Sequence, residues 1–351
     1  MSTVHILDVT LRDGSYAVDF AFTAVDTAAI CKGLESAGVE YIEIGHGVGM
    51  RASGEKYGWA AASDEDYLKA AQGVLTKAKF GMFCIPGVAS LEDLDLGRRY
   101  GMHFVRIGTN VTEVHQSEDY IRYAKKNELF VAANYMKSYA LPPAAFAEEV
   151  RKSVSYGVDM VYIVDSAGSM QVDDIGEYYR AVRAVTDVPI GFHGHDNLGL
   201  AIANSVAAAD IGIEYIDASL QGLGRSAGNA STEVLVAALL KKNYVLPIDL
   251  FQLFDVSQKH VRSLLPEKGR APLDIVCGLA EFHSSYMPHI QKFAAKYSVD
   301  PGKLILEVSK VDKINLDLSL LERIAQSLPK SPASLIQYGA RTYVGGEQDE
   351  K

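Results

Sequence analysis

The sequence predicts a closed (β/α)8 barrel, a TIM barrel, followed by a small C-terminal helical domain. Short β-rich runs alternate eight times with longer helix-compatible segments over roughly 240 residues, the usual size of such a barrel. Strands that alternate with helices form right-handed β–α–β units and a parallel sheet. An open doubly wound sheet is the alternative. It is disfavoured because no Gly-x-Gly-x-x-Gly turn follows the first run.

Each predicted strand is a short run rich in β-branched and aromatic residues. Helix-compatible segments between these runs include 24–37, 198–211 and 231–241. The order of the elements places all eight carboxyl ends at one mouth of the barrel, where the active sites of this fold gather. The eight predicted strands span residues 3–9, 40–44, 79–84, 103–107, 129–134, 159–164, 188–193 and 214–218.

The alternation of strands and helices ends after the eighth unit, and the rest of the chain reads as mainly helical. The segments there that best fit helices are 250–264, 276–298 and 317–328. The end of the chain, from Gly345 (GGEQDEK), is expected to be disordered. We therefore predict three regions. Residues 1–242 form a barrel with the metal and substrate site, residues 243–330 form a helical domain, and residues 331–351 form a tail.

The composition is that of an ordinary globular protein, with 48% hydrophobic and 22% charged residues and a net charge of -10. A protein that binds nucleic acid or an anionic membrane needs a basic face. The sequence holds no cluster of lysine and arginine that could supply one. We therefore expect neither of these partners.

The three cysteines, Cys31, Cys84 and Cys277, are far apart and form no Cys-x-x-Cys pair. This pattern disfavours a disulfide framework or a structural zinc site and favours a reducing compartment. The first residues show no positively charged leader with an apolar core, and no uncharged apolar run approaches the roughly 20 residues that span a bilayer. The expected location is the cytoplasm.

The motif His193-Gly194-His195 predicts a metal site at the end of the seventh strand. Alternate residues of a strand share a face, so both imidazoles can point into the mouth of the barrel. Asp13, at the end of the first strand, is the candidate third ligand. Such a site leaves positions open for water and a chelating substrate and suits Mn²⁺ or Mg²⁺, with Co²⁺ and Zn²⁺ as alternatives. A pair of core or surface histidines is the competing interpretation, which the barrel context disfavours.

Other side chains near the predicted strand ends are candidates for binding substrate. Arg12 could hold a carboxylate and a developing enolate, or it could be a surface cation. His46 and Ser166 follow the second and sixth strands and are predicted to contact the substrate with Arg12. The glycine-rich run from Gly222 to Asn229 either binds an anion through its backbone or simply connects to the next helix. Asp196 is interpreted as a helix cap.

Three separated motifs together resemble the metal-dependent lyase and synthase superfamily that includes the HMG-CoA lyases. They are Asp8-Val-Thr-Leu-Arg-Asp-Gly14, His193-Gly-His195 and the run Gly222–Asn229. Within the superfamily the chain is most similar to the 4-hydroxy-2-oxovalerate aldolases, over about residues 3 to 325. Supporting stretches include Ile42–Gly47, Val164–Gly168, Asp217–Gly222 and Phe282–Tyr286.

The resemblance implies a metal-dependent aldolase that forms or cleaves a 4-hydroxy-2-oxo acid from pyruvate and an aldehyde. It implies that Asp13, His193 and His195 hold the metal, which chelates the 2-oxo acid, and that Arg12 stabilises the enolate. It also implies a homo- or hetero-oligomer and an acylating aldehyde dehydrogenase that receives the aldehyde through the helical domain.

The chain departs from the aldolases at two positions. They usually carry histidine two residues after the Arg-Asp-Gly glycine, where this chain has Tyr16, and tyrosine where this chain has His283. Histidine is the better base near neutral pH, since an unperturbed tyrosine titrates near about 10. We hypothesise that His283 is the acid/base and Tyr16 its hydrogen-bonding partner. The alternative is that the exchange reshapes the pocket for another acceptor.

Three rival functions stay open at the level of sequence. An acyl-CoA condensing synthase of the isopropylmalate or homocitrate type usually carries Glu-Gln where this chain has Ser15-Tyr16, and an HMG-CoA lyase carries a cysteine in the loop that here spans Gly222–Asn229. A non-catalytic subunit of a dehydrogenase complex is the second rival. A Schiff-base mechanism through Lys137 is the third, and it is disfavoured by the paired histidines.

Overall fold

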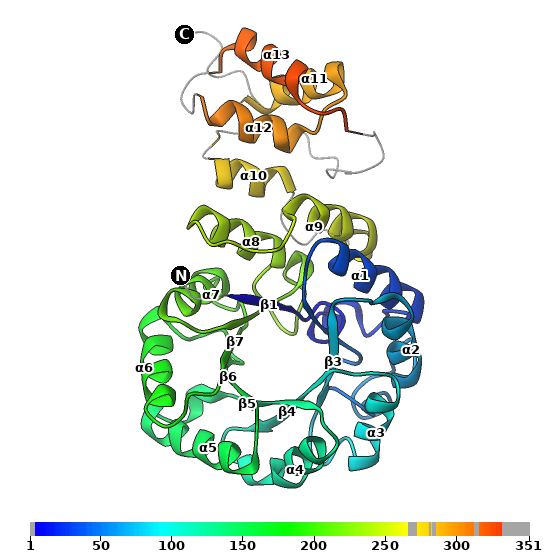
Figure 1. Cartoon of the computed structure of the whole chain (residues 1–351), viewed down its shortest axis with the longest axis vertical. Coiled ribbons are helices and arrows are strands. Elements are labelled where there is room, and N and C mark those ends of the chain that lie inside the picture. The colour runs from blue at the N-terminus through cyan, green and yellow to red at the C-terminus, as the bar shows by residue number, and fades with distance from the viewer. Residues whose placement is uncertain (1–3, 266–271, 281, 283–285, 312–315, 332–351) are drawn as a thin grey trace.

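The computed structural model describes residues 4–265, 272–280, 282, 286–311 and 316–331. In this part of the chain eight parallel strands close into a barrel in chain order (Figure 1). All eight predicted strands are confirmed, and their ends differ from prediction by three residues at most. They are β1 His5–Asp8, β2 Tyr41–Ile44, β3 Lys79–Cys84, β4 Phe104–Asn110, β5 Phe130–Met136, β6 Met160–Asp165, β7 Ile190–Gly194 and β8 Tyr215–Ala218.

A helix follows each strand and packs outside the barrel, with ends set by capping residues. Thr23 and Ser63 form capping boxes at the starts of the first two helices, and Gly157 and Gly212 end two others in the left-handed conformation that glycine adopts easily. These helices are α1 Ala24–Ser36, α2 Asp64–Val74, α3 Leu91–Arg99, α4 Glu118–Lys126, α5 Pro143–Tyr156, α6 Val172–Arg183, α7 Ala201–Ile211 and α8 Thr232–Lys241.

The hydrophobic core lies mainly between the barrel and its ring of helices. β6 and β7 are buried along their whole length, as expected of parallel strands that are covered on both faces. Inside the barrel the side chains are of a different kind, because a layer of charged groups crosses its centre. That layer lies below the mouth at the carboxyl ends of the strands.

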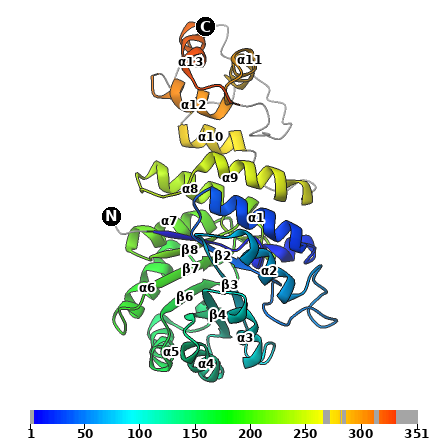
Figure 2. The same cartoon turned by 45° about the vertical axis from the view of Figure 1, so that its right-hand side comes forward.

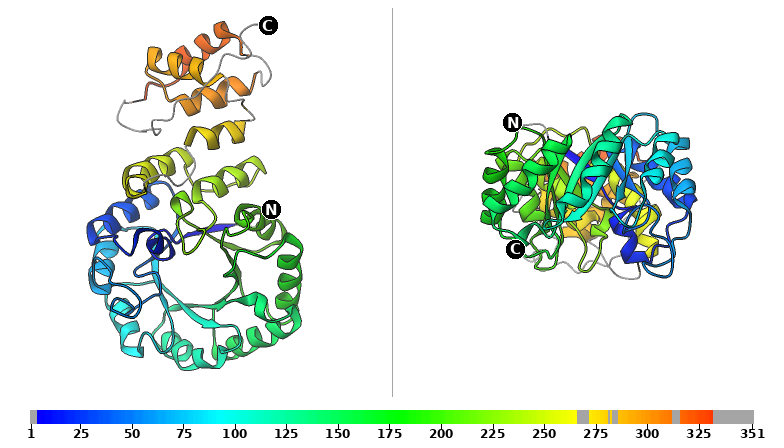
Figure 3. Two further views of the ribbon diagram at one scale, coloured as in Figure 1. Left: turned by 180° about the vertical axis from the view of Figure 1, so that it is seen from behind. Right: turned by 90° about the horizontal axis from the view of Figure 1, so that it is seen from below.

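Helices α10 to α13 stack away from one side of the barrel, beyond α8 and α9, as Figures 1 and 2 and the view from behind in Figure 3 show. The barrel with following helices agrees with the predicted fold, whereas the domain boundary near residue 243 remains a prediction. No helix in the described ranges is both long and apolar enough to cross a bilayer. The α-helices described after α8 are α9 Leu250–Val256, α10 Pro272–Ala280, α11 Met287–Tyr297, α12 Pro301–Ser309 and α13 Leu318–Ser327.

Two predictions for this region are wrong in detail. The single helix expected over 276–298 is two helices, α10 and α11, and Pro288 lies in the first turn of α11, where its missing N–H costs nothing. Helix α12 was not predicted, although Asp300 caps it and Pro301 begins it, which is a typical start signal. The expected disorder from Gly345 falls outside the described residues.

Candidate metal centre and active site

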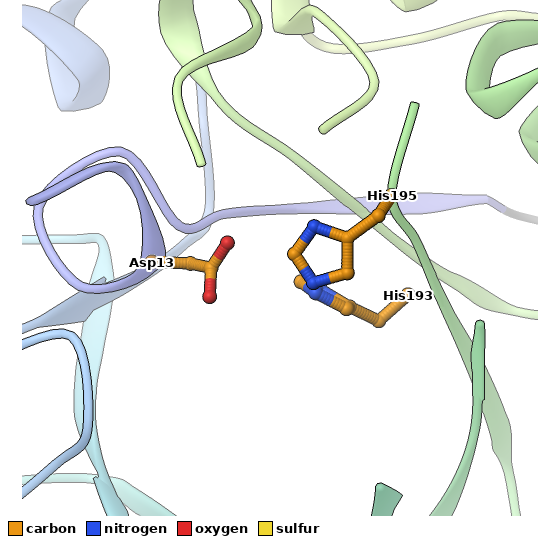
Figure 4. Close-up of side chains that lie close together, drawn as sticks. All are labelled: Asp13, His193 and His195. Atoms are coloured by element: carbon orange, nitrogen blue, oxygen red, sulfur yellow. The ribbon is translucent and has the colours of Figure 1, made fainter. Parts of the chain in front are cut away.

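The three predicted metal ligands lie together at the carboxyl mouth of the barrel. Asp13 begins a short 3-10 turn after β1, His193 is on β7 and His195 directly follows it. One ligand atom from each side chain lies within 4.8 Å of the others, and all three residues are buried. Figure 4 shows the carboxylate and the two imidazoles pointing toward one another. The structure therefore brings together residues that are about 180 positions apart in the chain.

The geometry of β7 explains why both imidazoles reach the mouth. His193 and His195 are two positions apart, so their side chains leave the backbone on the same face. The ring centroids are 5.0 Å apart and the planes are nearly perpendicular, at 84°. A Cβ atom at Gly194 would lie 2.8 Å from the ring of Phe192, so a larger residue there would displace that ring. Glycine between the histidines is thus required by packing.

Hydrogen bonds fix how each imidazole is presented. His193 Nδ1 lies 2.8 Å from an oxygen of Asp217, and His195 Nδ1 lies 3.2 Å from the carbonyl oxygen of Gly228. Both acceptors favour the tautomer with the proton on Nδ1, which leaves the Nε2 lone pair of each ring free. Burial lowers the pKa of His195 to about 4, although Asp13 opposes the shift. The ring is therefore neutral near pH 7, as a metal ligand must be.

Asp13 is held as an anion. Burial alone would raise its pKa, but the Arg12 guanidinium and the two histidines hold that pKa well below its usual range. Its Oδ1 accepts a hydrogen bond from Arg12 Nη1 at 2.6 Å, and its Oδ2 accepts one from Asn229 Nδ2 at 2.8 Å. Two imidazoles and one ionised carboxylate fit a divalent cation and leave coordination positions for water and substrate.

A chain of buried charges joins Arg12 to His193 through the centre of the barrel. Arg12 Nε donates to Glu43 at 2.6 Å, and Glu43 also accepts two hydrogen bonds from Arg106. Arg106 Nη1 donates at 2.5 Å to the same Asp217 oxygen that accepts from His193. Burial would raise the pKa of Glu43 and of Asp217, but Arg106 lowers both. This series of paired charges fixes the positions of the Arg12 and His193 side chains relative to each other.

Arg12 is held on several sides yet keeps one nitrogen unused. Its Nη1 contacts Asp13, its Nε contacts Glu43, and its guanidinium carbon lies 4.8 Å from the centre of the Phe83 ring. Nη2 makes no hydrogen bond to any side chain or backbone group in the described residues. Since Arg12 lines the cavity beside the metal ligands, this nitrogen can donate to a substrate oxygen.

A cavity of about 300 Å³ opens above the candidate metal ligands, a volume that suits a small metabolite. Its polar lining includes two of the predicted substrate or acid/base residues, Tyr16 and Ser166, both half-buried. Burial raises the pKa of Tyr16, so its hydroxyl stays protonated at neutral pH. The full lining is Arg12, Asp13, Tyr16, Gly47, Val48, Tyr57, Phe83, Ile85, Asn134, Met136, Val164, Ser166, His193, His195 and Arg225.

Two other candidates, His46 and Lys137, are placed less favourably. His46 is buried under a stacked Phe20 ring, with Nε2 bonded to the Gly58 carbonyl and Nδ1 accepting from Val48 N–H, and it does not line the cavity. Its substrate contact remains a prediction without support from these contacts. Lys137 is exposed and does not line the cavity either. His283 lies outside the described residues.

The glycine-rich run after β8 supports the metal ligands rather than forming an open anion cradle. Asn229 bonds to Asp13, and the Gly228 carbonyl accepts from His195 and from the Asp196 N–H. Asp196 in turn accepts from the N–H of Ala201, the first residue of α7, although the N-cap residue of that helix is Leu200 and not Asp196 as predicted.

Four residues of this centre were not predicted to have a role there. Glu43, Arg106 and Asp217 are polar residues on strands β2, β4 and β8, but their sequence positions do not show that they meet in one layer. For Asn229 the one signal in the sequence was its position in the glycine-rich run after the eighth strand.

Comparison with known proteins finds relatives over most of the chain. The model of the HMGL-like family matches residues 3–259. A 4-hydroxy-2-oxovalerate aldolase of Carboxydothermus hydrogenoformans is 38% identical, over 93% of this chain and 98% of the relative. One from Moorella thermoacetica is 40% identical, over 88% of this chain and 91% of the relative.

Solved structures show the same fold at lower identity. The hydroxymethylglutaryl-CoA lyase of Pseudomonas aeruginosa superposes with a TM-score of 0.66 at 19% identity, over 79% of this chain and 98% of that one. The carboxyl transferase domain of Rhizobium etli pyruvate carboxylase gives a TM-score of 0.64 at 16% identity, over 88% of this chain and 56% of that one. The family match and the near full-length relatives show that this chain belongs to the HMGL-like family.

Proposed function

We propose that this protein is a divalent-metal-dependent aldolase, a carbon–carbon lyase that cleaves or forms a 4-hydroxy-2-oxo acid from pyruvate and an aldehyde. The observation that carries the proposal is the approach of Asp13, His193 and His195 to within 4.8 Å in a cavity that Arg12 also lines. Relatives at 38% and 40% identity that are named 4-hydroxy-2-oxovalerate aldolase support it.

The roles of the residues follow from their positions. A divalent cation held by Asp13 and the two histidines would supply Lewis-acid polarisation of the keto group. Arg12 donates from Nη2 to the oxygen on which charge develops when the C3–C4 bond breaks, and its contacts to Glu43 and Asp13 keep it from having to reorganise during the reaction. Ser166, which lines the same cavity, is proposed to orient the substrate.

The acid/base assignment continues the hypothesis made from the sequence. Tyr16 lines the cavity and its raised pKa suits a hydrogen-bond donor better than a base. We assign the removal of the C4 hydroxyl proton to His283 and the placement of that hydroxyl to Tyr16. A His283→Ala variant that retains full cleavage would reject the assignment, whereas a Tyr16→Phe variant should keep part of the activity.

The identity of the metal and the setting of the protein are also proposals. One carboxylate with two imidazoles and open positions for oxygen ligands suits Mn²⁺ or Mg²⁺. The buried free thiols of Cys31 and Cys84 are consistent with a reducing compartment, and we propose the cytoplasm. Transfer of the aldehyde to an acylating aldehyde dehydrogenase, and an oligomeric assembly, remain predictions of the family resemblance.

The rival mechanisms have less support. A Schiff-base route needs a lysine in the cavity, and the described lining contains none. The acyl-CoA condensing alternative would release free CoA, and the relatives at 38–40% identity are named as aldolases instead.

The experiment that tests the proposal is an assay of metal-loaded protein with pyruvate and a panel of aldehydes. We expect pyruvate to be consumed, with loss of the activity when a chelator is added and recovery when Mn²⁺ is restored. Turnover that is unaffected by the chelator, or consumption only when an acyl-CoA is present, would contradict the proposal. A chromogenic thiol assay for free CoA distinguishes the second case.

A further inference from the structure

Arg225 is a cation at the cavity that has no ion-pair partner among the described residues. It lies in the glycine-rich run after β8, it lines the cavity, and its residue is exposed. Its backbone N–H approaches Asp13, but its side chain makes no hydrogen bond or ion pair with the described part of the chain. The other cavity arginine, Arg12, is by contrast bound to Glu43 and Asp13.

Arg225 lines the same cavity as Tyr16 and the candidate metal ligands. Burial raises the pKa of the Tyr16 hydroxyl, and Arg225 is among the cations that oppose this rise. Arg225 therefore adds a positive charge to the wall of the cavity that is expected to receive the substrates.

The remaining charges of the site balance without Arg225. Arg12 and Arg106 face three buried carboxylates, Asp13, Glu43 and Asp217, which leaves one net negative charge. A divalent cation and the carboxylate of one pyruvate would bring the total to zero. Arg225 would then be a surplus positive charge in the lining of the cavity, available to an anionic group of the second substrate.

We propose, on the basis of the proposed function, that Arg225 selects an acceptor aldehyde that carries a second, anionic group, a carboxylate or a phosphate. In the condensation direction the C3 carbon of pyruvate loses a proton and bonds to the aldehyde carbon, whose oxygen gains a proton. The anionic group is unchanged by the reaction. Arg225 binds it with paired N–H donors, as guanidinium groups bind carboxylates and phosphates, and so holds the carbonyl carbon near C3.

An alternative role for Arg225 is to stabilise the enolate of pyruvate itself. The two roles differ in what they predict for pyruvate alone. Exchange of the pyruvate methyl protons with deuterium requires the enolate but no aldehyde. If Arg225 serves the acceptor, its replacement leaves this exchange unchanged.

The test compares aldehydes that differ only in charge. Succinic semialdehyde is paired with butanal for the carboxylate, and glyceraldehyde 3-phosphate with glyceraldehyde for the phosphate. The proteins are the unmodified chain, Arg225→Gln, Arg225→Lys and Lys137→Gln. The last removes an exposed cation from the same end of the barrel without touching the cavity. Each is assayed for kcat/KM with every aldehyde and for deuterium exchange into pyruvate.

We expect the unmodified chain to prefer the anionic member of at least one pair, and the pair that shows the preference identifies carboxylate or phosphate. Arg225→Gln should lower kcat/KM for that aldehyde by about 10- to 100-fold, the usual effect of losing a charged hydrogen bond, and leave its neutral match unchanged. Arg225→Lys should retain part of the preference. Lys137→Gln and the deuterium exchange should be unaffected.

Other outcomes overturn the inference. If the unmodified chain shows no preference for either anionic aldehyde, or if Arg225→Gln lowers exchange and all acceptors equally, Arg225 does not select the acceptor. Absence of metal-dependent exchange in the unmodified chain would instead reject the proposed function.

Discussion

The two ends of the barrel both hold a cavity, but they are built from different side chains. The cavity at the carboxyl ends of the strands has about 300 Å³ and contains charged and ligating groups from β1, β7 and the loop after β8. The cavity at the amino ends has about 160 Å³ and is mainly aromatic, with Tyr41, Phe104, Tyr162 and Tyr215 in its wall. Arg106 also lines this second cavity, and its guanidinium pairs with Glu43 and Asp217.

The comparison teaches that buried charge, and not the presence of a cavity, marks the reactive end. Burying a charge is costly unless it is paired, so a barrel that keeps five ionised side chains together must compensate each of them. At the aromatic end packing alone is sufficient. Substitutions should therefore alter chemistry at one end and only packing at the other.

The largest difference between the ends is expected for a metal ligand. His195→Ala should lower turnover by about 1000-fold or more, since Lewis-acid stabilisation is worth several kcal/mol and each 1.36 kcal/mol is a factor of ten. Steady-state kinetics at saturating Mn²⁺ measure this. Phe104→Leu at the aromatic end is the matched buried substitution and should leave turnover per folded molecule unchanged. If turnover of His195→Ala is within tenfold of that of the unmodified chain, the carboxyl end does not differ from the aromatic end in the way proposed.

Breaking the charged layer should cost stability. Arg106→Met leaves Asp217 buried without its arginine and Glu43 with Arg12 as its one remaining arginine partner in the layer, and should lower the free energy of unfolding by about 3 to 5 kcal/mol. Chemical denaturation measures this loss. The exposed pair Arg122–Glu118 provides the control, since Arg122→Met should cost at most about 1 kcal/mol. Equal losses in the two variants would mean that the layer is not specially stabilising.

Low pH should destabilise the metal-free protein because of the buried titratable groups at the carboxyl end of the barrel. His195 has a pKa of about 4 in the folded chain and about 6.5 when unfolded, so between these pH values only the unfolded chain takes up the proton. The free energy of unfolding should fall by up to about 3 kcal/mol as the pH falls from 7 to 4. The lowered pKa values of Glu43 and Asp217 add to the loss as their unfolded forms protonate.

Denaturation in the presence of chelator at several pH values measures this effect. His195→Gln should be less sensitive to pH over the same window. The same pH sensitivity in both proteins would show that His195 does not titrate as described.

A smaller effect is expected from the residue that orients His193. Asp217→Asn should weaken Mn²⁺ binding by about 10- to 100-fold, the usual loss when the partner of a ligating histidine is replaced. Calorimetric titration of folded protein gives the dissociation constant. Asp210→Asn, which removes an exposed carboxylate paired with Lys242, should leave it unchanged. If the dissociation constant for Mn²⁺ is unaltered in Asp217→Asn, the buried charged layer does not contribute to metal binding.

The smallest effect belongs to the aromatic end. Tyr41→Phe removes a hydroxyl from the wall of that cavity and should change the free energy of unfolding by no more than about 0.5 kcal/mol. Turnover should equal that of the unmodified chain. A loss of turnover in a stable Tyr41→Phe protein would show that the amino end also takes part in the chemistry.

The strand pattern and the metal ligands could be predicted because both follow from short-range rules. Alternation of side chains along β7 places His193 and His195 on one face, and the parallel order of the strands brings Asp13 to them. The buried layer of Glu43, Arg106 and Asp217 could not be predicted as a connected set. Which strand-end side chains meet depends on the register between strands, and the sequence alone does not specify that register.

Prediction was weaker where the outcome depends on tertiary contacts. His46 follows a strand, as the other candidate substrate-binding residues do, and was therefore predicted to contact the substrate. In the structure the segment after β2 folds back, and His46 Nε2 is hydrogen-bonded to the Gly58 carbonyl. Asn229 and Gly228 are far from Asp13 and His195 in sequence and contact them only because the loop after β8 returns over the mouth. The break between α10 and α11 was missed because apolar periodicity continues across it, although Pro288 marks a helix start.

The most direct measurement is a titration of the metal-free chain with Mn²⁺, followed by electron paramagnetic resonance of the free ion. If Asp13, His193 and His195 form the metal centre, the unmodified chain should bind about one Mn²⁺ per chain tightly, and Asp13→Asn and His193→Ala should each abolish that tight binding while staying folded. Tight binding of Mn²⁺ that persists in both variants would contradict the account.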